Sequence, residues 1–307
     1  MKSTVVIALP GDEPLAEALS ESLGGIVAML EYRRFPDGES YLRIHDSLDD
    51  SSVVIVARLA RPDPKIPALM FAADLVRDLG AARVGLVAPY LPYMRQDARF
   101  KPGEALTSAS FARWISSHFD WLVTVDPHLH RYESLDEIYT IPSAVIPAAP
   151  ALADWILTNV QRPVVIGPDA ESTQWVEAVA THAGLPWRVM RKQRFGDHDV
   201  RIAAPDLSGL EQRTAVLVDD IVSSGTTLAR AAEALIEAGL GPPQCVAVHG
   251  LFGKDSRNTL AAAGIGKVVC TDSVDVAEGV IQVAPLFAPA VLSMIEGNMT
   301  QGDAPGR

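Results

Sequence analysis

Cysteine, aromatic side chains, basic charge and long apolar runs are all scarce in this 307-residue chain. The two cysteines, Cys245 and Cys270, lie in apolar runs, which favours buried thiols in a reducing compartment over a disulfide framework. A net charge of −12 argues against the broad basic surface that nucleic acids or anionic membranes require. The opening run 4–9 ends at Pro10-Gly11, and no apolar stretch approaches the ~20 residues that span a bilayer. These absences predict a cytoplasmic protein without a nucleic-acid or membrane partner.

The length and the 48% hydrophobic content are sufficient for two domains with buried cores. Short runs rich in Val and Ile alternate with segments rich in Ala and Leu, which is the pattern of strand–helix–strand units. We therefore expect an α/β fold with two similar halves, each a mostly parallel sheet flanked by helices. The expected strands are residues 5–9, 53–57, 83–88 and 121–125 in the first half and residues 164–166, 215–218, 245–249 and 268–271 in the second.

Prolines mark the expected crossover between the halves. Pro142, Pro147 and Pro150 interrupt the segment IPSAVIPAAPAL and predict irregular structure there. The predicted domains are residues 1–145 and 146–285, followed by a terminal segment, 286–307, with a helix and a tail after Met299 whose composition is typical of disorder.

Residues 214–235, TAVLVDDIVSSGTTLARAAEAL, carry the strongest functional signal. The apolar run is typical of a buried parallel strand, so Asp219 and Asp220 are expected at a strand's carboxyl end, where open α/β sheets bind ligands. The loop 223–227 (Ser223, Ser224, Gly225, Thr226, Thr227) then offers hydroxyls and backbone N–H groups at the start of a helix. This arrangement predicts a socket for one phosphate with two carboxylates beside it.

The carboxylates indicate what accompanies the phosphate. They would repel it unless they bind sugar hydroxyls or a magnesium ion, and a phosphorylated sugar satisfies both demands. The alternative for Asp219 and Asp220 alone is an ordinary strand–turn–helix with an Asp cap. The complete order of strand, acid pair, hydroxyl-rich loop and helix favours the binding site.

Three further polar segments occur in the first half: RFPDGESYLRI (34–44), VAPYLPYMRQDARFKPGE (87–104) and WLVTVDPHLH (121–130). Phe35 could stack on a flat ring while Asp37 and Glu39 accept hydrogen bonds from an exocyclic amine. Cations after the strand ending near Pro89 could hold a polyphosphate. Each segment taken singly also has a structural interpretation. Residues 34–44 could be a turn before an edge strand, residues 87–104 a solvated surface loop, and His128 a packing residue. His128 and His130 lack further donors for a structural zinc site, whereas magnesium needs fewer protein ligands.

Together these segments resemble the ribose-phosphate pyrophosphokinase family over almost the whole chain. The family's Phe-x-Asp-Gly-Glu turn matches residues 35–39, its Pro-Tyr-x-x-Tyr-x-Arg-Gln-Asp stretch matches 89–97, its Pro-Gly-Glu matches 102–104, and its Asp-x-His matches 126–128. The acid pair and the loop after it resemble the phosphoribosyl-pyrophosphate loop that this family shares with phosphoribosyltransferases.

The resemblance implies two phosphoribosyltransferase-like domains with the active site in the cleft between them. Residues 1–145 would bind ATP and residues 146–285 ribose 5-phosphate, with the helix of 286–307 folding back on the first domain. The implied roles are adenine and ATP binding by Phe35, Asp37, Glu39, Arg95, Gln96 and Asp97; sugar-phosphate binding by Asp219, Asp220, Ser223, Ser224, Gly225, Thr226 and Thr227; magnesium positioning by His128 and Asp169; and catalysis by Lys192 and Arg194 of a flexible arm. Family members are homo-oligomers.

The implied reaction transfers the β,γ-diphosphoryl group of ATP to the 1-hydroxyl of ribose 5-phosphate, giving phosphoribosyl pyrophosphate and AMP. Three alternatives remain. A phosphoribosyltransferase would not need the first-half segments. Lys192, Arg194 and His128 argue against a catalytically silent regulatory homologue, but Glu171 keeps that alternative open. A diphosphokinase could use another phosphosugar or nucleotide.

Three departures from the family pattern stand out. Ala170-Glu171-Ser172 follows Asp169 where a Gly-Gly pair is usual, and residues 223–227 replace the frequent Asp-Thr-x-Gly-Thr. The segment 61–65, Arg-Pro-Asp-Pro-Lys, stands where many relatives have Asn-Asp-Asn. We therefore expect a divergent member.

Overall fold

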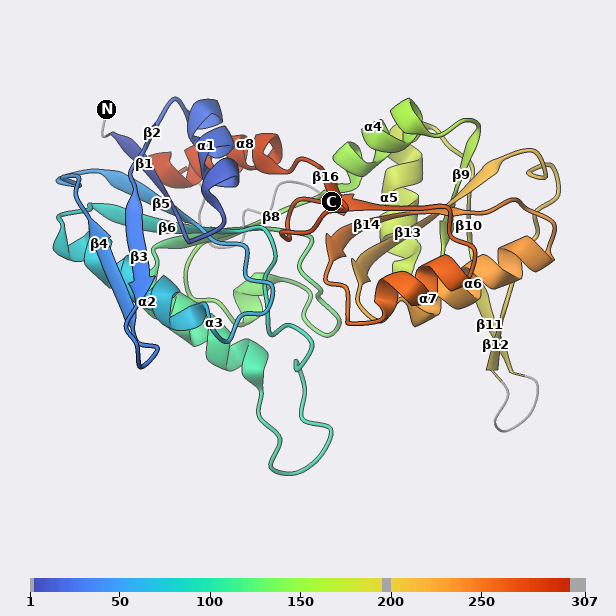
Figure 1. Cartoon of the computed structure of the whole chain (residues 1–307), viewed down its shortest axis with the longest axis horizontal. Coiled ribbons are helices and arrows are strands. Elements are labelled where there is room, and N and C mark those ends of the chain that lie inside the picture. The colour runs from blue at the N-terminus through green and yellow to red at the C-terminus, as the bar shows by residue number, and fades with distance from the viewer. Residues whose placement is uncertain (1–2, 195–199, 299–307) are drawn as a thin grey trace. The chain divides into compact units, whose positions relative to one another are not determined.

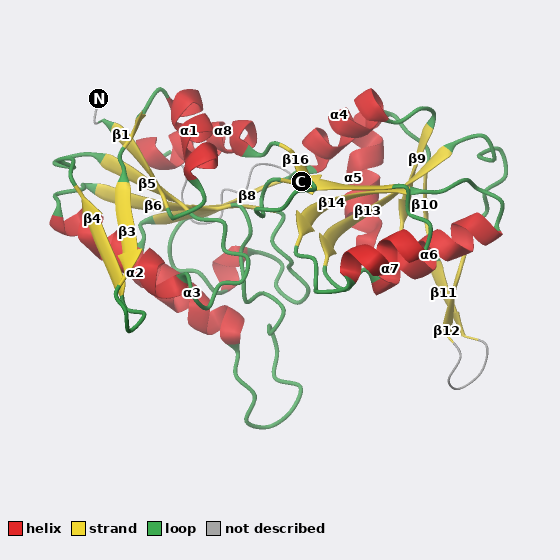
Figure 2. Cartoon of the chain, viewed as in Figure 1, coloured by secondary structure: helices red, strands yellow, loops and turns green. Residues whose placement is uncertain are grey.

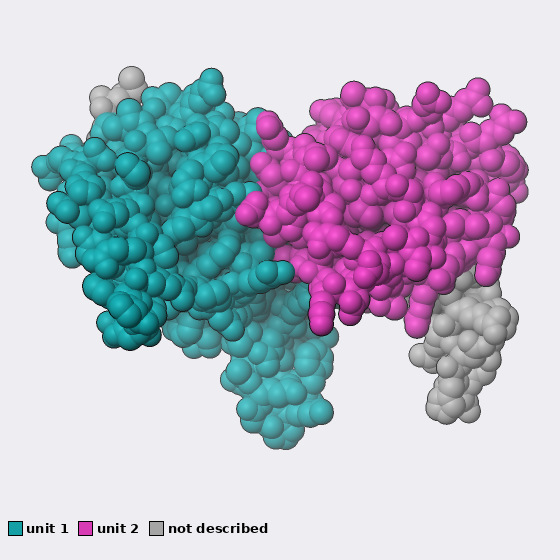
Figure 3. Space-filling model, viewed as in Figure 1, with its two compact units in different colours: residues 1–146, 283–307 teal, residues 147–282 magenta. Residues whose placement is uncertain are grey.

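Two six-stranded parallel sheets form the centre of the computed structural model, which describes residues 3–194 and 200–298. The chain divides into unit 1, residues 1–146 and 283–307, and unit 2, residues 147–282 (Figure 3). Within the described part of the chain, no helix has the length and apolar character needed to cross a membrane.

The sheet of unit 1 has the strand order β2-β1-β5-β6-β7-β8, and every neighbouring pair is parallel. Its strands are β1 (Thr4–Ala8), β2 (Ile26–Val27), β5 (Ser52–Val56), β6 (Arg83–Ala88), β7 (Trp121–Val125) and β8 (Ser143–Ile146). Helices α1 (Glu13–Leu23) and α8 (Ala284–Glu296) pack together on one face, and α2 (Ile66–Asp78) and α3 (Thr107–His118) lie on the other (Figures 1 and 2). A short 3₁₀ helix, Leu135–Glu137, precedes β8.

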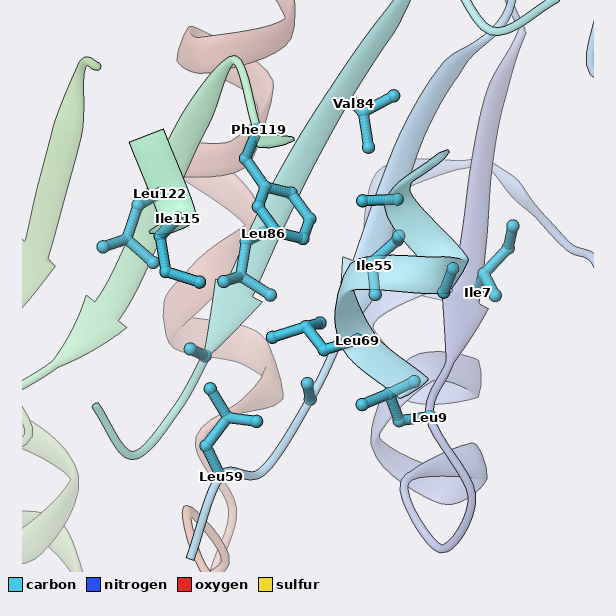
Figure 4. Close-up of a cluster of buried hydrophobic side chains, with 14 of the residues drawn as sticks. Ile7, Leu9, Ile55, Leu59, Leu69, Val84, Leu86, Ile115, Phe119 and Leu122 are labelled. Atoms are coloured by element: carbon cyan, nitrogen blue, oxygen red, sulfur yellow. The ribbon is translucent and has the colours of Figure 1, made fainter. Parts of the chain in front are cut away.

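The apolar strands explain the core of this unit. Strands β5 and β7 are buried along their whole length, because helices cover both faces of the sheet. Figure 4 shows Ile55 of β5 and Leu86 of β6 meeting Leu69 of α2 and Ile115 of α3. Burial of each such side chain stabilises the fold by about 1.5–3 kcal/mol.

Unit 2 repeats this architecture with the order β10-β9-β13-β14-β15-β16, again parallel throughout. Its strands are β9 (Pro163–Gly167), β10 (Trp187–Val189), β13 (Thr214–Val222), β14 (Gln244–Gly250), β15 (Lys267–Thr271) and β16 (Gly279–Ile281). Helix α4 (Ala149–Asn159) packs on α5 (Thr173–Ala183), and α6 (Thr226–Glu237) packs on α7 (Ser256–Ala262) (Figure 1). The 3₁₀ helix η2, Ala170–Ser172, precedes α5.

An antiparallel hairpin follows the edge strand in each unit. In unit 1 it consists of β3 (Leu30–Arg34) and β4 (Ser40–Ile44), and in unit 2 of β11 (Arg191–Arg194) and β12 (Val200–Ala203). The predicted Phe35 turn and the predicted flexible arm therefore occupy corresponding positions in the two units. None of the four strands is among the expected ones; an edge strand after the Phe35 turn and a basic hairpin at Lys192 and Arg194 were only the alternatives to a binding role.

The proline-rich segment between the halves is more regular than expected. It contains β8 and the start of α4, so the expectation of irregular structure was wrong. Pro147 falls between the two elements, and Pro150 lies in the first turn of α4, where its missing N–H leaves no intrahelical hydrogen bond unmade. Both cysteines are buried free thiols, as predicted, and burial raises the pKa of Cys270 to about 12.

Candidate functional site

The strand order of unit 2 reverses between β9 and β13, which is where open parallel sheets bind ligands. Asp169 follows β9, while Asp219 and Asp220 lie near the carboxyl end of β13. The structure thus brings three acidic residues that were singled out in the sequence to one edge of one sheet.

Strand β13 is longer than predicted and includes both acids. It pairs with β9 only up to Leu217, but its pairing with β14 continues to Val222. The expectation that the strand ends at residue 218 was therefore wrong, because β14 supplies partners for three of the next four residues, Asp219, Ile221 and Val222. Asp219 and Asp220 extend beyond the end of β9 while remaining fixed by the ladder.

The three carboxylates create a local excess of negative charge. Burial, together with the nearby charges of Asp220 and Asp169, raises the pKa of Asp219 to about 8. Asp220 is itself buried, with 6% of its surface exposed. A ligand that donates hydrogen bonds or carries positive charge would offset this electrostatic repulsion. Sugar hydroxyls and hard cations are ligands of this kind.

Asp219→Asn should raise the melting temperature, by a few degrees at pH 8 and by less at pH 5. The folded pKa of about 8 lies above the usual 3.8, so the folded protein binds the extra proton and its stability falls as pH rises between these values. The neutral amide removes this loss. Thermal unfolding at both pH values measures the effect, with Asp46→Asn as an exposed control in unit 1. An increase in melting temperature that is the same at both pH values would contradict the raised pKa of Asp219.

The loop 223–227 is shaped by Gly225. This residue has φ +77° and precedes the first residue of α6, so the helix begins at Thr226, two residues earlier than an irregular loop through Thr227 would allow. Ser224 Oγ accepts a hydrogen bond from the Thr226 N–H at 3.3 Å. The first N–H groups of a helix have no intrahelical acceptor and attract an anion.

The outer side of the same loop is held by α7. The Ser223 carbonyl accepts hydrogen bonds from the Gly253 N–H at 3.0 Å and from the buried Ser256 hydroxyl. Leu260 packs against Gly225, with side-chain atoms 3.0 Å from where a β-carbon would stand. The loop is therefore fixed before any ligand arrives, which lowers the entropy cost of binding.

Asp169 caps the 3₁₀ helix that follows β9. Its Oδ1 accepts a hydrogen bond from the Glu171 N–H at 3.1 Å, and its carbonyl accepts one from Ser172 Oγ at 2.7 Å. Glu171 is exposed and lines a hollow of about 1320 Å³ that also includes Trp187, Arg188 and Arg191. The unusual acid thus faces an open space in unit 2.

The oxygen donors of unit 2 fit magnesium in chemical type. Mg²⁺ prefers carboxylate oxygens and keeps several waters or phosphate oxygens, so one or two protein ligands suffice. Among the described residues, no cluster of three or more His, Cys, Asp or Glu side chains has the geometry of a metal site. His128 belongs to unit 1 and Asp169 to unit 2.

Lys192 and Arg194 lie two residues apart on β11, whose backbone pairs with β12. Lys192 is opposite Ile202, and Arg194 is opposite Val200. Both side chains fall outside the described part of the structure, so their catalytic roles remain predictions.

In unit 1 the predicted adenine-binding residues form the tip of the β3–β4 hairpin. The Phe35 N–H donates to the Glu39 carbonyl at 2.8 Å, and Asp37 Oδ1 accepts from the Glu39 N–H at 3.2 Å. The Phe35 ring is 39% exposed, and the guanidinium of Arg33 lies 4.7 Å from its centre. The ring is therefore available to a flat partner beside a cation.

The segment after β6 contains Arg95, Gln96 and Asp97. The Gln96 carbonyl accepts hydrogen bonds from the backbone and hydroxyl of Ser108 in α3. The Asp97 carboxylate is 2% exposed, and its Oδ1 accepts from Arg131 Nη1 at 2.7 Å. Further on, Glu104 closes the turn by accepting from the N–H groups of Phe100 and Lys101. Asp97 is thus turned inward, although it was predicted to bind ATP.

Arg131→Ala should lower the free energy of unfolding by about 1–3 kcal/mol, because the buried Asp97 carboxylate loses its ionic partner. Urea denaturation at neutral pH measures the change. The matched control is Arg113→Ala, which removes an exposed guanidinium bound to Ser110 on α3 and should change the stability by less than about 0.5 kcal/mol. Equal effects of the two substitutions would contradict a stabilising role for the pair.

His128 follows β7 and is partly buried. Its ring meets that of His130 edge to face, with the centroids 4.5 Å apart. Asp126 has φ +31°, a strained backbone for an aspartate, and this turns the chain directly before His128.

A buried ion pair, missed by the sequence analysis, occupies the corresponding strand reversal of unit 1, between β1 and β5. The guanidinium of Arg58 donates from Nε to Asp12 Oδ1 at 2.6 Å and from Nη2 to the Gly11 carbonyl at 2.7 Å. The backbone N–H of Arg58 donates to Asp12 Oδ2 at 2.8 Å. The only signal was a charged residue inside the apolar run VVIVARLA. Unit 1 therefore places an internal ion pair where unit 2 presents carboxylates.

The sheet topology, the acid pair and the glycine-led phosphate loop define a phosphoribosyltransferase-type α/β protein. Residues 134–287 match the model of the phosphoribosyl transferase domain, and residues 4–118 match that of the N-terminal domain of ribose phosphate pyrophosphokinase. The chain belongs to the ribose-phosphate pyrophosphokinase family. The predicted family and fold class are confirmed.

Relatives with this name align along nearly their whole length. The ribose-phosphate pyrophosphokinase of Methanopyrus kandleri is 33% identical over 94% of this chain and 98% of its own, and that of Halobacterium salinarum is 32% identical over 91% and 97%. The crystal structure of phosphoribosylpyrophosphate synthetase from Mycobacterium smegmatis superposes with a TM-score of 0.83 at 23% identity. It covers 96% of this chain and 100% of that one, which supports the same fold.

Proposed function

We propose that the chain catalyses transfer of the β,γ-diphosphoryl group of ATP to the 1-hydroxyl of ribose 5-phosphate, with phosphoribosyl pyrophosphate and AMP as products. The observation that carries this proposal is the arrangement in unit 2, where Asp219 and Asp220 stand beside the preformed phosphate loop. Family membership is consistent with the same reaction.

Unit 2 would bind the sugar phosphate. Asp219 and Asp220 accept hydrogen bonds from the ribose hydroxyls, which offsets their mutual repulsion. The 5-phosphate binds the N–H groups at the start of α6, together with the hydroxyls of Ser223, Ser224, Thr226 and Thr227. Gly225 provides the turn that aims these groups at one point.

Unit 1 would bind the nucleotide. Phe35 stacks on the adenine, Asp37 and Glu39 accept from its amino group, and Arg95 and Gln96 hold the phosphates. Because the Asp97 carboxylate is buried against Arg131, we propose that Asp97 supports this segment instead of touching ATP.

The nucleophile is a substrate hydroxyl, so no serine or cysteine nucleophile is needed. Lys192 and Arg194 would neutralise charge that develops on the transferred group, and alignment of the hydroxyl with the β-phosphorus would provide much of the remaining acceleration. Magnesium, held with the help of His128 and Asp169, would supply charge neutralisation on the phosphate oxygens. The reaction requires that the nucleotide of unit 1 reach the sugar of unit 2.

The test is incubation of pure protein with Mg²⁺, ATP and ribose 5-phosphate. The expected result is AMP and phosphoribosyl pyrophosphate in equal amounts. ADP as the nucleotide product would indicate ordinary phosphoryl transfer, and no product with any nucleotide or phosphosugar would identify a silent homologue. Turnover only with another acceptor or donor would change the substrate but keep the reaction class.

Two further properties belong to this proposal. A homo-oligomeric state is expected from the family, and size-exclusion chromatography with light scattering measures it. A cytoplasmic location agrees with two buried free thiols, because disulfides are rare in reducing compartments.

A further inference from the structure

Tyr93 has an unusual backbone close to the proposed ATP phosphate contacts. Its φ is +63°, in the left-handed region that a bulky side chain rarely adopts, and it lies two residues before Arg95. Such an outlier persists only where surrounding contacts hold it, and it often marks a functional segment. The reversal at Tyr93 sets the direction in which the chain continues to Arg95 and Gln96.

Two contacts hold the Tyr93 side chain. Its hydroxyl donates to Asp63 Oδ1 at 2.6 Å, and its ring packs against Phe111 of α3 with the centroids 5.0 Å apart. Burial and the Asp63 carboxylate raise the pKa of Tyr93 to about 12, so the hydroxyl remains a donor throughout the physiological range. The ring contact alone would fix the side chain to the core, whereas the hydroxyl ties it to a separate segment.

That segment, residues 61–65, is constrained in several places. Pro62 and Pro64 restrict their own φ angles, and the Pro62 carbonyl accepts from the N–H of Lys65 at 2.7 Å. Lys65 Nζ donates to the Arg58 carbonyl at 2.6 Å, which links the segment to the buried Arg58–Asp12 pair. Asp63 therefore lies in a segment whose backbone is conformationally restricted.

The same segment reaches the hairpin that carries Phe35. Arg34 Nη2 donates to the Pro64 carbonyl in a long hydrogen bond of 3.4 Å. Residues 61–65 thus contact Arg34, which precedes Phe35, and Tyr93, which lies two residues before Arg95. This is also where the sequence departs from the family's Asn-Asp-Asn.

We propose that Asp63 and Tyr93 are a positioning pair that sets the affinity for ATP by fixing the orientation of the Arg95–Gln96 segment. Neither residue needs to touch the nucleotide. The inference rests on the proposed function, in which Arg95 and Gln96 bind the phosphates of ATP.

The test measures binding of Mg·ATP and of ribose 5-phosphate to the full chain by calorimetry. Tyr93→Phe removes only the hydroxyl, and Asp63→Ala removes its acceptor. Each should weaken ATP binding about 5–20-fold and change ribose 5-phosphate binding less than twofold. The double variant should be no weaker than either single variant, because both remove one hydrogen bond. Asp63→Asn, which keeps an acceptor oxygen, should restore most of the affinity.

Tyr139→Phe is the control, because it removes a buried tyrosine hydroxyl elsewhere in unit 1 and should leave ATP affinity unchanged. ATP affinity within twofold of the parent in both single variants would overturn the pair. Equal weakening of ATP binding and of ribose 5-phosphate binding would also overturn the pair, because it indicates a general loss of structure. Failure of the unaltered protein to bind ATP would instead overturn the proposed function, and the pair with it.

Discussion

Lys192→Ala should lower turnover by about 10²–10³-fold while changing the affinity for ribose 5-phosphate less than about threefold. The reason is that a cation aimed at the transferred diphosphoryl group acts mainly as charge develops there, so its loss falls on the transition state more than on the bound substrate. Steady-state kinetics with both substrates varied, combined with calorimetric binding of ribose 5-phosphate, separates the two effects.

The control for this prediction is the neighbouring cation. Arg191 precedes Lys192 on β11 and lies opposite Ala203, so Arg191→Ala removes one positive charge from the same strand. We expect it to reduce turnover less than about threefold. A comparable loss in both variants would mean that the strand acts through its net charge. Loss of turnover and of ribose 5-phosphate affinity by the same factor would place Lys192 in ground-state binding.

The sheets could be predicted because their strands are buried on both faces. Strands β6 and β7 have the predicted bounds, and β1, β5, β9, β14 and β15 differ by one residue at one or both ends. A continuous Val- and Ile-rich run is a strong signal for such strands. The four edge strands, β2, β8, β10 and β16, were not predicted, because they are short and partly exposed. The two hairpins give no comparable signal, because β3 and β4 are polar, partly exposed and held by pairing with each other.

Local motifs predicted which residues gather at the strand reversal of unit 2, since the carboxyl ends of adjacent parallel strands meet at one edge. They did not predict the length of β13, which depends on how far β14 extends beside it. The pairs Asp12–Arg58 and Asp63–Tyr93 join residues 46 and 30 positions apart, so no pattern within one segment reveals them. The inward turn of Asp97 likewise depends on Arg131, 34 positions away.

Gly225→Ala should weaken ribose 5-phosphate binding about 10–100-fold and lower the free energy of unfolding by about 1–2 kcal/mol. Alanine disfavours φ +77°, and its β-carbon would lie 3.0 Å from Cγ and Cδ2 of Leu260. The loop must therefore shift, and the N–H groups at the start of α6 no longer point toward one phosphate position. Calorimetry with ribose 5-phosphate and urea denaturation measure the two effects.

Gly239→Ala separates backbone strain from the loss of the phosphate site. Gly239 has φ +93° just after α6, and an added β-carbon there meets no atom within 4 Å. It should cost similar stability and leave ribose 5-phosphate affinity unchanged. If Gly225→Ala loses stability but binds ribose 5-phosphate like the parent, the phosphate does not bind at the start of α6. The acid pair would then serve a ligand held by other groups, since Asp219 and Asp220 are fixed by β13 independently of this turn.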